Sequence, residues 1–366
     1  MLNNHIKINL FSNCILSPAN VYICTLISIK EMNKLSLANT PTKIEKLTRL
    51  SDLLNSNIFI KRDDQTGSEY SGNKIRKLEY SIKEALDQGC DFLITCGGIQ
   101  SNHCRATVAA AVKLGLNSAV LLRISDTPEL EGNYFLDKLM GADVHFCTRE
   151  EYSNSRTEIM EKLAAQYKEQ GYKPYIIPEG ASNGIGTMGY YSAMKEIVEQ
   201  EKQLGINFDT IIVACGSGGT VAGLNVANKV HNYGKRIVGM CVCDDNWYFQ
   251  TRIAEMSNVC LEYLVKFGEI STEEASKQQF TPEEIEMNDK YVGIGYALSR
   301  PEELEFINKI ASLEGVVFDP VYTGKGLYGV WNELQEGGNL NTSKNILFIH
   351  TGGLFGLFPV SKSFDI

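Results

Sequence analysis

Lys74 is the residue whose position most directly suggests chemistry. It follows Gly72, which permits a tight turn, and Asn73, a good N-cap for the amphipathic helix expected next. The helix dipole repels a cation in the first turn, and Arg76 and Lys77 add two more positive charges there. A lysine crowded by cations has a lowered pKa, and its neutral amine can form a Schiff base with a carbonyl compound. This stretch alone leaves a solvated basic helix start as the alternative.

A second polar stretch runs from Gly97 to His103, between an expected strand and an expected helix. The free N–H groups of a helix N-terminus bind anions, and the side chains of Ser101 and Asn102 add further polar groups. A simple glycine turn with an asparagine cap is the alternative. Because four polar residues stand in a row from Gln100 to His103, we favour a binding site.

A glycine-rich loop, Gly216-Ser217-Gly218-Gly219-Thr220, follows another expected strand and opens the next helix. Glycines let backbone N–H groups approach a phosphate closely, and the helix dipole strengthens the attraction. The loop is not of the Walker A type, because no Lys-Ser or Lys-Thr pair follows it. It predicts a phosphate ligand. A dinucleotide is the weaker alternative, in which Asp244 would contact a ribose.

Two further turns carry Tyr322, within residues 319–326, and Thr351, within residues 350–353. Tyr322 is either a core aromatic residue or, beside glycine turns at the same sheet edge, an acid/base group. His350 ends an expected buried strand, which favours a packing role. We expect no metal site, because His, Cys and carboxylate residues nowhere show metal-ligand spacing.

Strands and helices that must position these residues alternate from about residue 35 onward. Short apolar runs predict strands at residues 58–61, 92–96, 118–122, 143–147, 175–177, 210–214, 237–243 and 345–349. Amphipathic stretches predict helices at residues 74–88, 102–114, 133–140, 155–170, 186–203, 220–230, 248–267, 301–313 and 324–334. This alternation predicts an α/β fold of two three-layer α/β/α domains with mainly parallel sheets. Ligands in such folds bind at the carboxyl ends of the strands.

The composition excludes several classes of partner. The 366 residues carry a net charge of −9, and 43% of them are hydrophobic, which is enough for packed cores. Nucleic acids and membrane surfaces attract basic proteins, so we expect neither as a partner. The ten cysteines include no CxxC pair, which favours reduced thiols in an intracellular protein.

The N-terminal segment differs from the rest of the chain, since it has no Arg and no acidic residue before Glu31. Its apolar stretches are too short and interrupted to span a bilayer, and it lacks the basic start and clean apolar run of a signal peptide. We interpret residues 1–34 as an extension outside the fold and expect a cytoplasmic protein. The scarcity of acidic residues leaves an organellar transit peptide as the alternative.

Together, the lysine, the Ser-Asn loop, the glycine loop and the tyrosine suit pyridoxal phosphate. The lysine would bind its aldehyde, the glycine loop its phosphate and the Ser-Asn loop a substrate carboxylate, while the tyrosine would move a proton. A nicotinamide-dependent oxidoreductase would use the glycine loop and Asp244. That alternative leaves Lys74, Ser101 and Tyr322 without a role.

From about residue 41 to residue 358 the chain resembles the fold-type II pyridoxal-phosphate enzymes, the tryptophan synthase β-like superfamily. Within it, the chain is similar to the group that contains D-cysteine desulfhydrase and 1-aminocyclopropane-1-carboxylate deaminase. The resemblance rests on stretches that occur in one order, at residues 61–64, 72–80, 97–103, 216–220, 319–325 and 348–353. With it we expect a large cofactor-binding domain of residues 35–76 and 188–366, a small domain of residues 77–187, and a homodimer.

The resemblance also implies which residues bind the cofactor. Lys74 would hold it covalently, Lys77 would lie near the phosphate, and Asn102 would bond the pyridine 3′-oxygen. Thr351 would place a hydroxyl against the pyridine nitrogen, with Thr323 also near the cofactor. The phosphate cup would consist of Gly216, Ser217, Gly218, Gly219 and Thr220.

The substrate-binding and catalytic residues follow from the same resemblance. Ser101, Asn102 and His103 would hold the substrate carboxylate, and Ser101 also matches a serine proposed to act as nucleophile or proton shuttle. Tyr296 and Tyr322 match two active-site tyrosines. Lys74, once free, would remove the Cα proton.

Two residues depart from the deaminase pattern. Thr323 follows Tyr322 where the deaminases have Glu, and His103 follows Asn102 where they have Gln. Both match the desulfhydrase side of the group. We therefore expect β-elimination from D-cysteine to pyruvate, hydrogen sulfide and ammonia. The alternatives are deamination of 1-aminocyclopropane-1-carboxylate and a lyase reaction on a related β-substituted amino acid such as cysteate.

Overall fold

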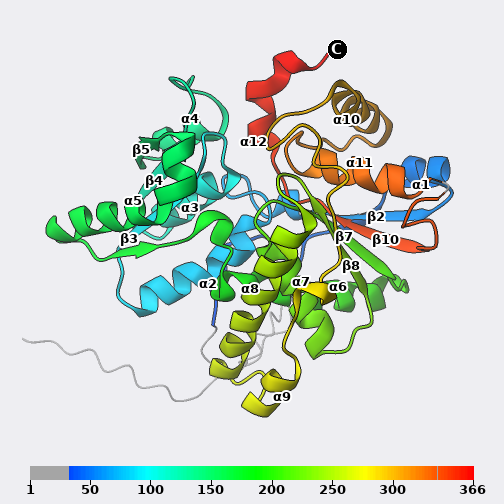
Figure 1. Cartoon of the computed structure of the whole chain (residues 1–366), viewed down its shortest axis with the longest axis horizontal. Helices are drawn as coiled ribbons and strands as arrows, with labels where there is room; N and C mark the ends of the chain where they lie inside the picture. Colours follow the sequence, from blue (N-terminus) through cyan, green and yellow to red (C-terminus); the bar gives the residue numbers. More distant parts are fainter. Residues whose placement is uncertain (1–32, 336) are drawn as a thin grey trace, which may run out of the picture. The chain divides into compact units, whose positions relative to one another are not determined.

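The computed structural model describes residues 33–335 and 337–366, which contain two β-sheets (Figure 1). The larger sheet consists, in spatial order, of β1 (Ile44–Lys46), β2 (Asn57–Lys61), β10 (Asn345–Ile349), β7 (Thr210–Cys215), β8 (Arg236–Cys241) and β9 (Met287–Asn288). The smaller sheet consists of β5 (Asp143–Cys147), β4 (Asn117–Arg123), β3 (Phe92–Gly98) and β6 (Pro174–Ile176). All neighbouring strands are parallel except β1 and β2, which are antiparallel.

Helices cover both faces of the larger sheet. Alternate residues of β7 point to opposite sides, since Ile211 and Val213 belong to one core cluster and Ile212 belongs to another. The first core includes residues of α6 (Gly184–Leu204), α7 (Gly219–Val230) and α8 (Asn246–Lys266). The second includes residues of α1 (Thr48–Leu54), α10 (Pro301–Glu314) and α11 (Thr323–Glu333). The larger sheet is thus the middle of three layers.

The smaller sheet is layered in the same way. Leu93 of β3 packs with residues of α2 (Lys74–Asp87) and α3 (Asn102–Lys113). Its neighbours Phe92 and Ile94 pack with residues of α5 (Arg149–Glu169) on the opposite face. Helix α4 (Gly132–Leu139) packs against α3 and β5. The predicted α/β class with mainly parallel sheets is therefore confirmed, whereas the predicted domain boundaries stay a prediction.

Each predicted strand and helix corresponds to an observed one, but short elements were missed. These are β1, β9, α1, α9 (Thr272–Lys277) and α12 (Leu354–Leu357), which are two to seven residues long and too short for a clear periodic pattern. The predicted start of α5 was wrong by six residues, because a capping box between Thr148 and Glu151 begins this helix earlier. Within the described residues, no helix is both long and apolar enough to cross a bilayer.

A buried group of charges ties the start of α2 to β2 and α6. The guanidinium of Arg76 donates to both carboxylate oxygens of Asp63, each at 2.9 Å, and also to Glu196. Lys61, the last residue of β2, donates to Glu196 at 2.6 Å. Burial by itself raises the pKa of Asp63, but Arg76 and Lys61 outweigh it and hold this pKa at about 2. This group anchors the helix that begins with Lys74.

Candidate active site

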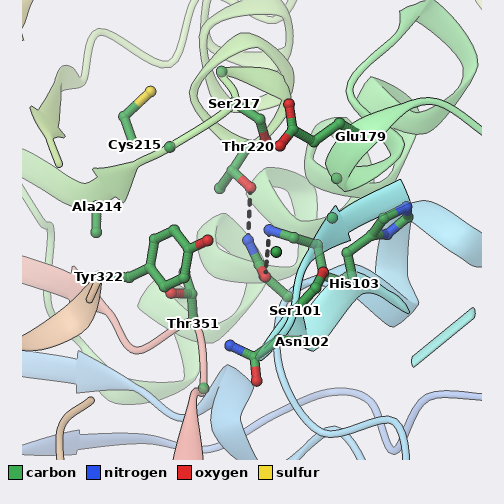
Figure 2. Close-up of a pocket in the computed structure, with 18 of the residues that line it drawn as sticks. Ser101, Asn102, His103, Glu179, Ala214, Cys215, Ser217, Thr220, Tyr322 and Thr351 are labelled. Carbon is green, nitrogen blue, oxygen red and sulfur yellow. Dashed lines mark hydrogen bonds between the residues drawn. The ribbon is translucent and has the colours of Figure 1, made fainter. Parts of the chain in front are cut away.

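A cleft lies where strands of both sheets end, and it brings together most of the residues predicted to do chemistry (Figure 2). It encloses about 740 Å³ of space not filled by protein atoms, part of which is open to solvent. The predicted residues that line it are Lys74, Ser101, Asn102, His103, Gly216, Ser217, Gly218, Thr220, Tyr296, Tyr322 and Thr351. Lys77, Gly219 and Thr323 lie behind this lining.

Lys74 is held at the cleft by a close contact between two backbone segments. Gly72 has φ of +108°, and a Cβ atom there would lie 2.7 Å from the backbone oxygen of Thr351, so only glycine fits. The backbone N–H of Asn73 donates to the same oxygen at 3.1 Å. Asn73 occupies the N-cap position of α2, as predicted, but its side chain makes no capping hydrogen bond. Its amide instead donates to Thr220 at 3.0 Å and accepts from Lys74 at 3.2 Å.

The pKa of Lys74 is lowered to about 8, as expected, but for a different reason. Burial is the main cause, and the nearby Cys215, Glu179 and Asp319 partly offset it. Arg76 turns away from the cleft toward Asp63, so crowding by that cation does not explain the shift. About half of the Lys74 side chains are neutral at pH 8, and a neutral amine can attack a carbonyl group.

The glycine loop between β7 and α7 has the donors and the open space that a phosphate requires. Gly218 has φ of +88°, and a Cβ atom on Gly219 would lie 2.8 Å from Nζ of Lys77. Lys77 is buried and donates to Ser182 Oγ at 2.9 Å, and Ser182 lies 2.8 Å from Ser217 Oγ. Burial lowers the pKa of Lys77 well below 10.5. Its amine and two hydroxyls thus meet free N–H groups at the first turn of α7. These residues fit the phosphate of pyridoxal phosphate.

The loop between β3 and α3 presents polar groups from the opposite side of the cleft (Figure 2). Ser101 caps α3, with its Oγ accepting from the backbone N–H of Cys104 at 3.1 Å. Asn102 borders the cleft in the first helical turn. His103 is buried and lies 2.7 Å from Thr95 Oγ1, and burial lowers its pKa well below 6.5. The loop therefore offers neutral hydrogen-bonding groups to a bound carboxylate.

Two predicted threonines, Thr351 and Thr323, differ in their position relative to the cleft. Thr351 lines the cleft beside Tyr322 (Figure 2). Thr323 is fully buried, and its Oγ1 donates to Asp319 at 2.6 Å, while the backbone N–H of Asp319 donates back to it at 2.9 Å. Thr323 is therefore held against Asp319, whose carboxylate accepts from the backbone N–H groups of Tyr322 and Thr323 at the start of α11, and it does not border the cleft.

Glu179 is a cleft residue that sequence reasoning missed. It lies just after β6, and its carboxylate accepts a hydrogen bond at 2.7 Å from the hydroxyl of the buried Tyr152. It contributes to the raised pKa values of Tyr296 and Tyr322. A carboxylate after a three-residue strand carries no motif of its own. It also lies far along the chain from the other site residues, so no local sequence pattern linked it to them.

Comparisons with known proteins agree with this geometry. Residues 35–352 match the family described as pyridoxal-phosphate dependent enzyme. A mitochondrial bifunctional D-cysteine desulfhydrase/1-aminocyclopropane-1-carboxylate deaminase of Arabidopsis thaliana is 43% identical over 332 residues, which cover 88% of this chain and 79% of the relative. A putative 1-aminocyclopropane-1-carboxylate deaminase of Thermotoga maritima is 39% identical over 331 residues, which cover 90% of this chain and 99% of the relative.

A solved structure gives the same result for the fold. The crystal structure of a homologue of 1-aminocyclopropane-1-carboxylate deaminase (ACC deaminase) superposes with a TM-score of 0.80 at 34% identity. The match covers 92% of this chain and 96% of that chain. It therefore includes both sheets and the cleft between their strand ends.

Proposed function

The chain belongs to the pyridoxal-phosphate dependent enzymes, and we propose that it is a lyase that eliminates sulfide from D-cysteine. The products are pyruvate, ammonia and hydrogen sulfide. The observation that carries this proposal is that Lys74, Ser101 and Tyr322 line one cleft, because elimination needs a base, a carboxylate site and a proton donor. Family membership also confirms the predicted cofactor and leaves the nicotinamide alternative without support.

The cofactor would be held from three sides. Lys74 would bind its aldehyde carbon, and the loop from Gly216 to Thr220, with Lys77 behind it, would bind its phosphate. Asn102 would donate to the 3′-oxygen, and Thr351 would face the pyridine nitrogen. When bound, pyridoxal phosphate withdraws electrons from the substrate α-carbon and so makes its proton acidic.

The side chains of this protein would then carry the substrate and the protons. The Ser101 hydroxyl and the N–H groups at the start of α3 would bind the substrate carboxylate. The neutral amine of Lys74 would take the proton from the α-carbon. As the C–S bond breaks with its electron pair on sulfur, Tyr322 would donate a proton to the leaving thiolate. Water then replaces the amino group, which balances pyruvate, ammonia and hydrogen sulfide.

Deamination of 1-aminocyclopropane-1-carboxylate is the second candidate activity. The names of both relatives support it, since each includes deaminase activity toward this compound. Ring opening breaks a carbon–carbon bond and has no thiolate leaving group. His103 and Thr323 depart from the deaminase pattern, so we expect D-cysteine to be the better substrate.

Product assays test the proposed reaction. On one preparation of the purified enzyme, we expect sulfide and pyruvate in equal amounts from D-cysteine, and little ammonia from 1-aminocyclopropane-1-carboxylate. Equal kcat/KM values for the two substrates would contradict the preference. Absence of sulfide with D-cysteine would contradict the proposed reaction.

A labelling experiment tests the proposed lysine. Borohydride reduction of the loaded enzyme, followed by peptide mapping, should place the pyridoxyl group on Lys74. Lys77 is the internal control, because it lies three residues away and near the same phosphate site. A label on Lys77, or none at all, would contradict the assignment.

We also propose that the enzyme is a cytoplasmic homodimer. The family resemblance supports the dimer, and light scattering of the purified chain would measure its mass. The name of the Arabidopsis relative includes the word mitochondrial, which supports organellar targeting as the alternative. Fractionation of cells that express the tagged chain would distinguish the two locations.

A further inference from the structure

Asn133 lies outside the cleft but holds the side chain of Asn102, which borders it. Asn133 is in the first turn of α4 and is fully buried. Its amide nitrogen donates to the backbone oxygen of Gln100 and to Oδ1 of Asn102, each at 3.0 Å. Its backbone N–H donates to Oε1 of Gln100 at 2.8 Å. Three hydrogen bonds thus join the start of α4 to the loop that precedes α3.

These contacts determine which end of the Asn102 amide faces the cleft. A backbone carbonyl only accepts hydrogen bonds, so the oxygen of Gln100 requires the nitrogen of the Asn133 amide. The second N–H of that nitrogen requires an acceptor, and Oδ1 of Asn102 provides it. The NH₂ group of Asn102 is left as a donor. Figure 2 shows this nitrogen directed toward the side of the pocket where Tyr322 and Thr351 lie.

The arrangement is maintained at a cost to stability. Oδ1 of Asn133 is buried and has no hydrogen-bond partner among the described residues, and an unpaired buried oxygen is unfavourable. The preceding Gly132 has φ of +57°, and a Cβ atom there would lie 2.3 Å from Oε1 of Gln100. The backbone at the start of α4 is therefore shaped to bring Asn133 against this loop.

We propose that Asn133 is a positioning residue that makes Asn102 present N–H donors, and not its oxygen, to an anionic oxygen of the bound cofactor. This inference rests on the proposed function, in which Asn102 bonds the 3′-oxygen of pyridoxal phosphate. An inverted Asn102 amide would place its carbonyl oxygen against that oxygen. A charge-assisted hydrogen bond would then be replaced by repulsion between two acceptors.

Two variants separate orientation from packing. Asn133→Asp keeps the shape of the side chain but accepts where Asn133 donates, so it should draw the NH₂ group of Asn102 toward itself. Asn133→Ala removes the donor and leaves the Asn102 amide free to adopt either orientation. Because an aspartate also buries a carboxylate beside the Gln100 carbonyl, the thermal midpoint of each variant is measured together with its cofactor affinity. A purely structural role predicts losses of affinity that follow the falls in thermal midpoint. An orienting role predicts a loss for Asp that exceeds what its thermal midpoint accounts for.

The measurement is an absorbance titration of pyridoxal phosphate into the full chain freed of cofactor, at pH 8. We expect the dissociation constant to rise about tenfold or more in Asn133→Asp and roughly threefold in Asn133→Ala. Gln100→Ala is the matched control. It removes side-chain bonds between the same loop and α4 but keeps the bond from Asn133 to Asn102, so its dissociation constant should stay within about twofold of the wild type.

The outcomes are distinct. A loss in Asn133→Ala equal to or greater than that in Asn133→Asp would overturn the orienting role, as would an equal loss in Gln100→Ala. If Asn133→Asp does not fold, as judged by its thermal midpoint, a larger loss of affinity in Asn133→Ala than in Gln100→Ala at equal thermal midpoints supports the proposal, and an equal loss overturns it. A wild-type chain that binds no pyridoxal phosphate would overturn the proposed function itself.

Discussion

The hydroxyl groups of Tyr296 and Tyr322 lie 2.7 Å apart at one wall of the cleft. At this distance one hydroxyl donates to the other, and the second keeps its own proton for a further partner. Burial raises the pKa of Tyr296 to about 12 and that of Tyr322 well above 10. Both tyrosines are therefore protonated at neutral pH and can donate a proton to a leaving group.

Replacing Tyr322 by Phe should slow elimination from D-cysteine by about 100-fold in kcat, a typical effect of removing a general acid. The ring packing is kept, so we expect little change in KM or in the absorbance of the bound cofactor. Tyr296→Phe is the matched control and should lose less, because it leaves the Tyr322 hydroxyl in place. An unchanged kcat in Tyr322→Phe would show that another group protonates the sulfur.

The lowered pKa of Lys74 predicts how covalent cofactor uptake depends on pH. Only the neutral amine attacks an aldehyde, so the uptake rate of the cofactor-free chain should rise with pH and level off above about 8. A lysine with the ordinary pKa of 10.5 would instead show a rise that continues beyond pH 10. Stopped-flow absorbance measures this rate. Free Nα-acetyllysine in the same buffers is the control.

The substitution Thr323→Glu should destabilise the protein and not create a deaminase. Thr323 is fully buried against Asp319, so a glutamate there would place a second carboxylate beside the first. We expect the free energy of unfolding to fall by about 3 kcal/mol or more. Thr323→Ser keeps the hydroxyl, so its free energy of unfolding should fall by less. Denaturant titration measures both. A stable Thr323→Glu variant with higher deaminase activity would contradict this prediction and show that Thr323 alone determines which substrate is used.

The buried pair of Asp63 and Arg76 predicts a stability change of similar size. Asp63→Asn leaves the guanidinium of Arg76 only partly compensated and should lower the free energy of unfolding by about 3–5 kcal/mol. Asp64→Asn is the control, since Asp64 pairs with the partly exposed Arg62 and should cost less than about 1 kcal/mol. Equal losses in the two variants would contradict a special role for the buried pair.

The pH dependence of this contribution follows from the lowered pKa of Asp63. Because that pKa is about 2 in the folded protein, against an ordinary value of 3.8, the stabilisation is fully present above about pH 4. It is lost as pH falls from about 4 to about 2. Between pH 4 and pH 2 the wild type should therefore lose more stability than Asp63→Asn, as measured by thermal midpoints.

The central strands and the loops of the site could be predicted from the sequence. β3, β7 and β10 are buried on both faces, so each reads as a continuous apolar run. The glycine loop after β7 and the Ser-Asn loop after β3 directly follow such runs, and parallel strands bring their carboxyl ends to one edge. Lys74 was recognisable because a lysine after Gly-Asn in a first helical turn is locally unfavourable.

Contacts between distant segments were decided only by the tertiary structure. Glu179 lies at the cleft, where its carboxylate accepts a hydrogen bond from Tyr152. Thr323 lies outside the cleft lining, because its hydroxyl is bonded to Asp319. The amide of Asn73 turned from its own helix to Thr220, 147 residues away in the chain. Local sequence patterns record propensity and periodicity. These patterns do not show which buried polar groups form hydrogen bonds with one another, because those bonds depend on how the two sheets and their helices pack.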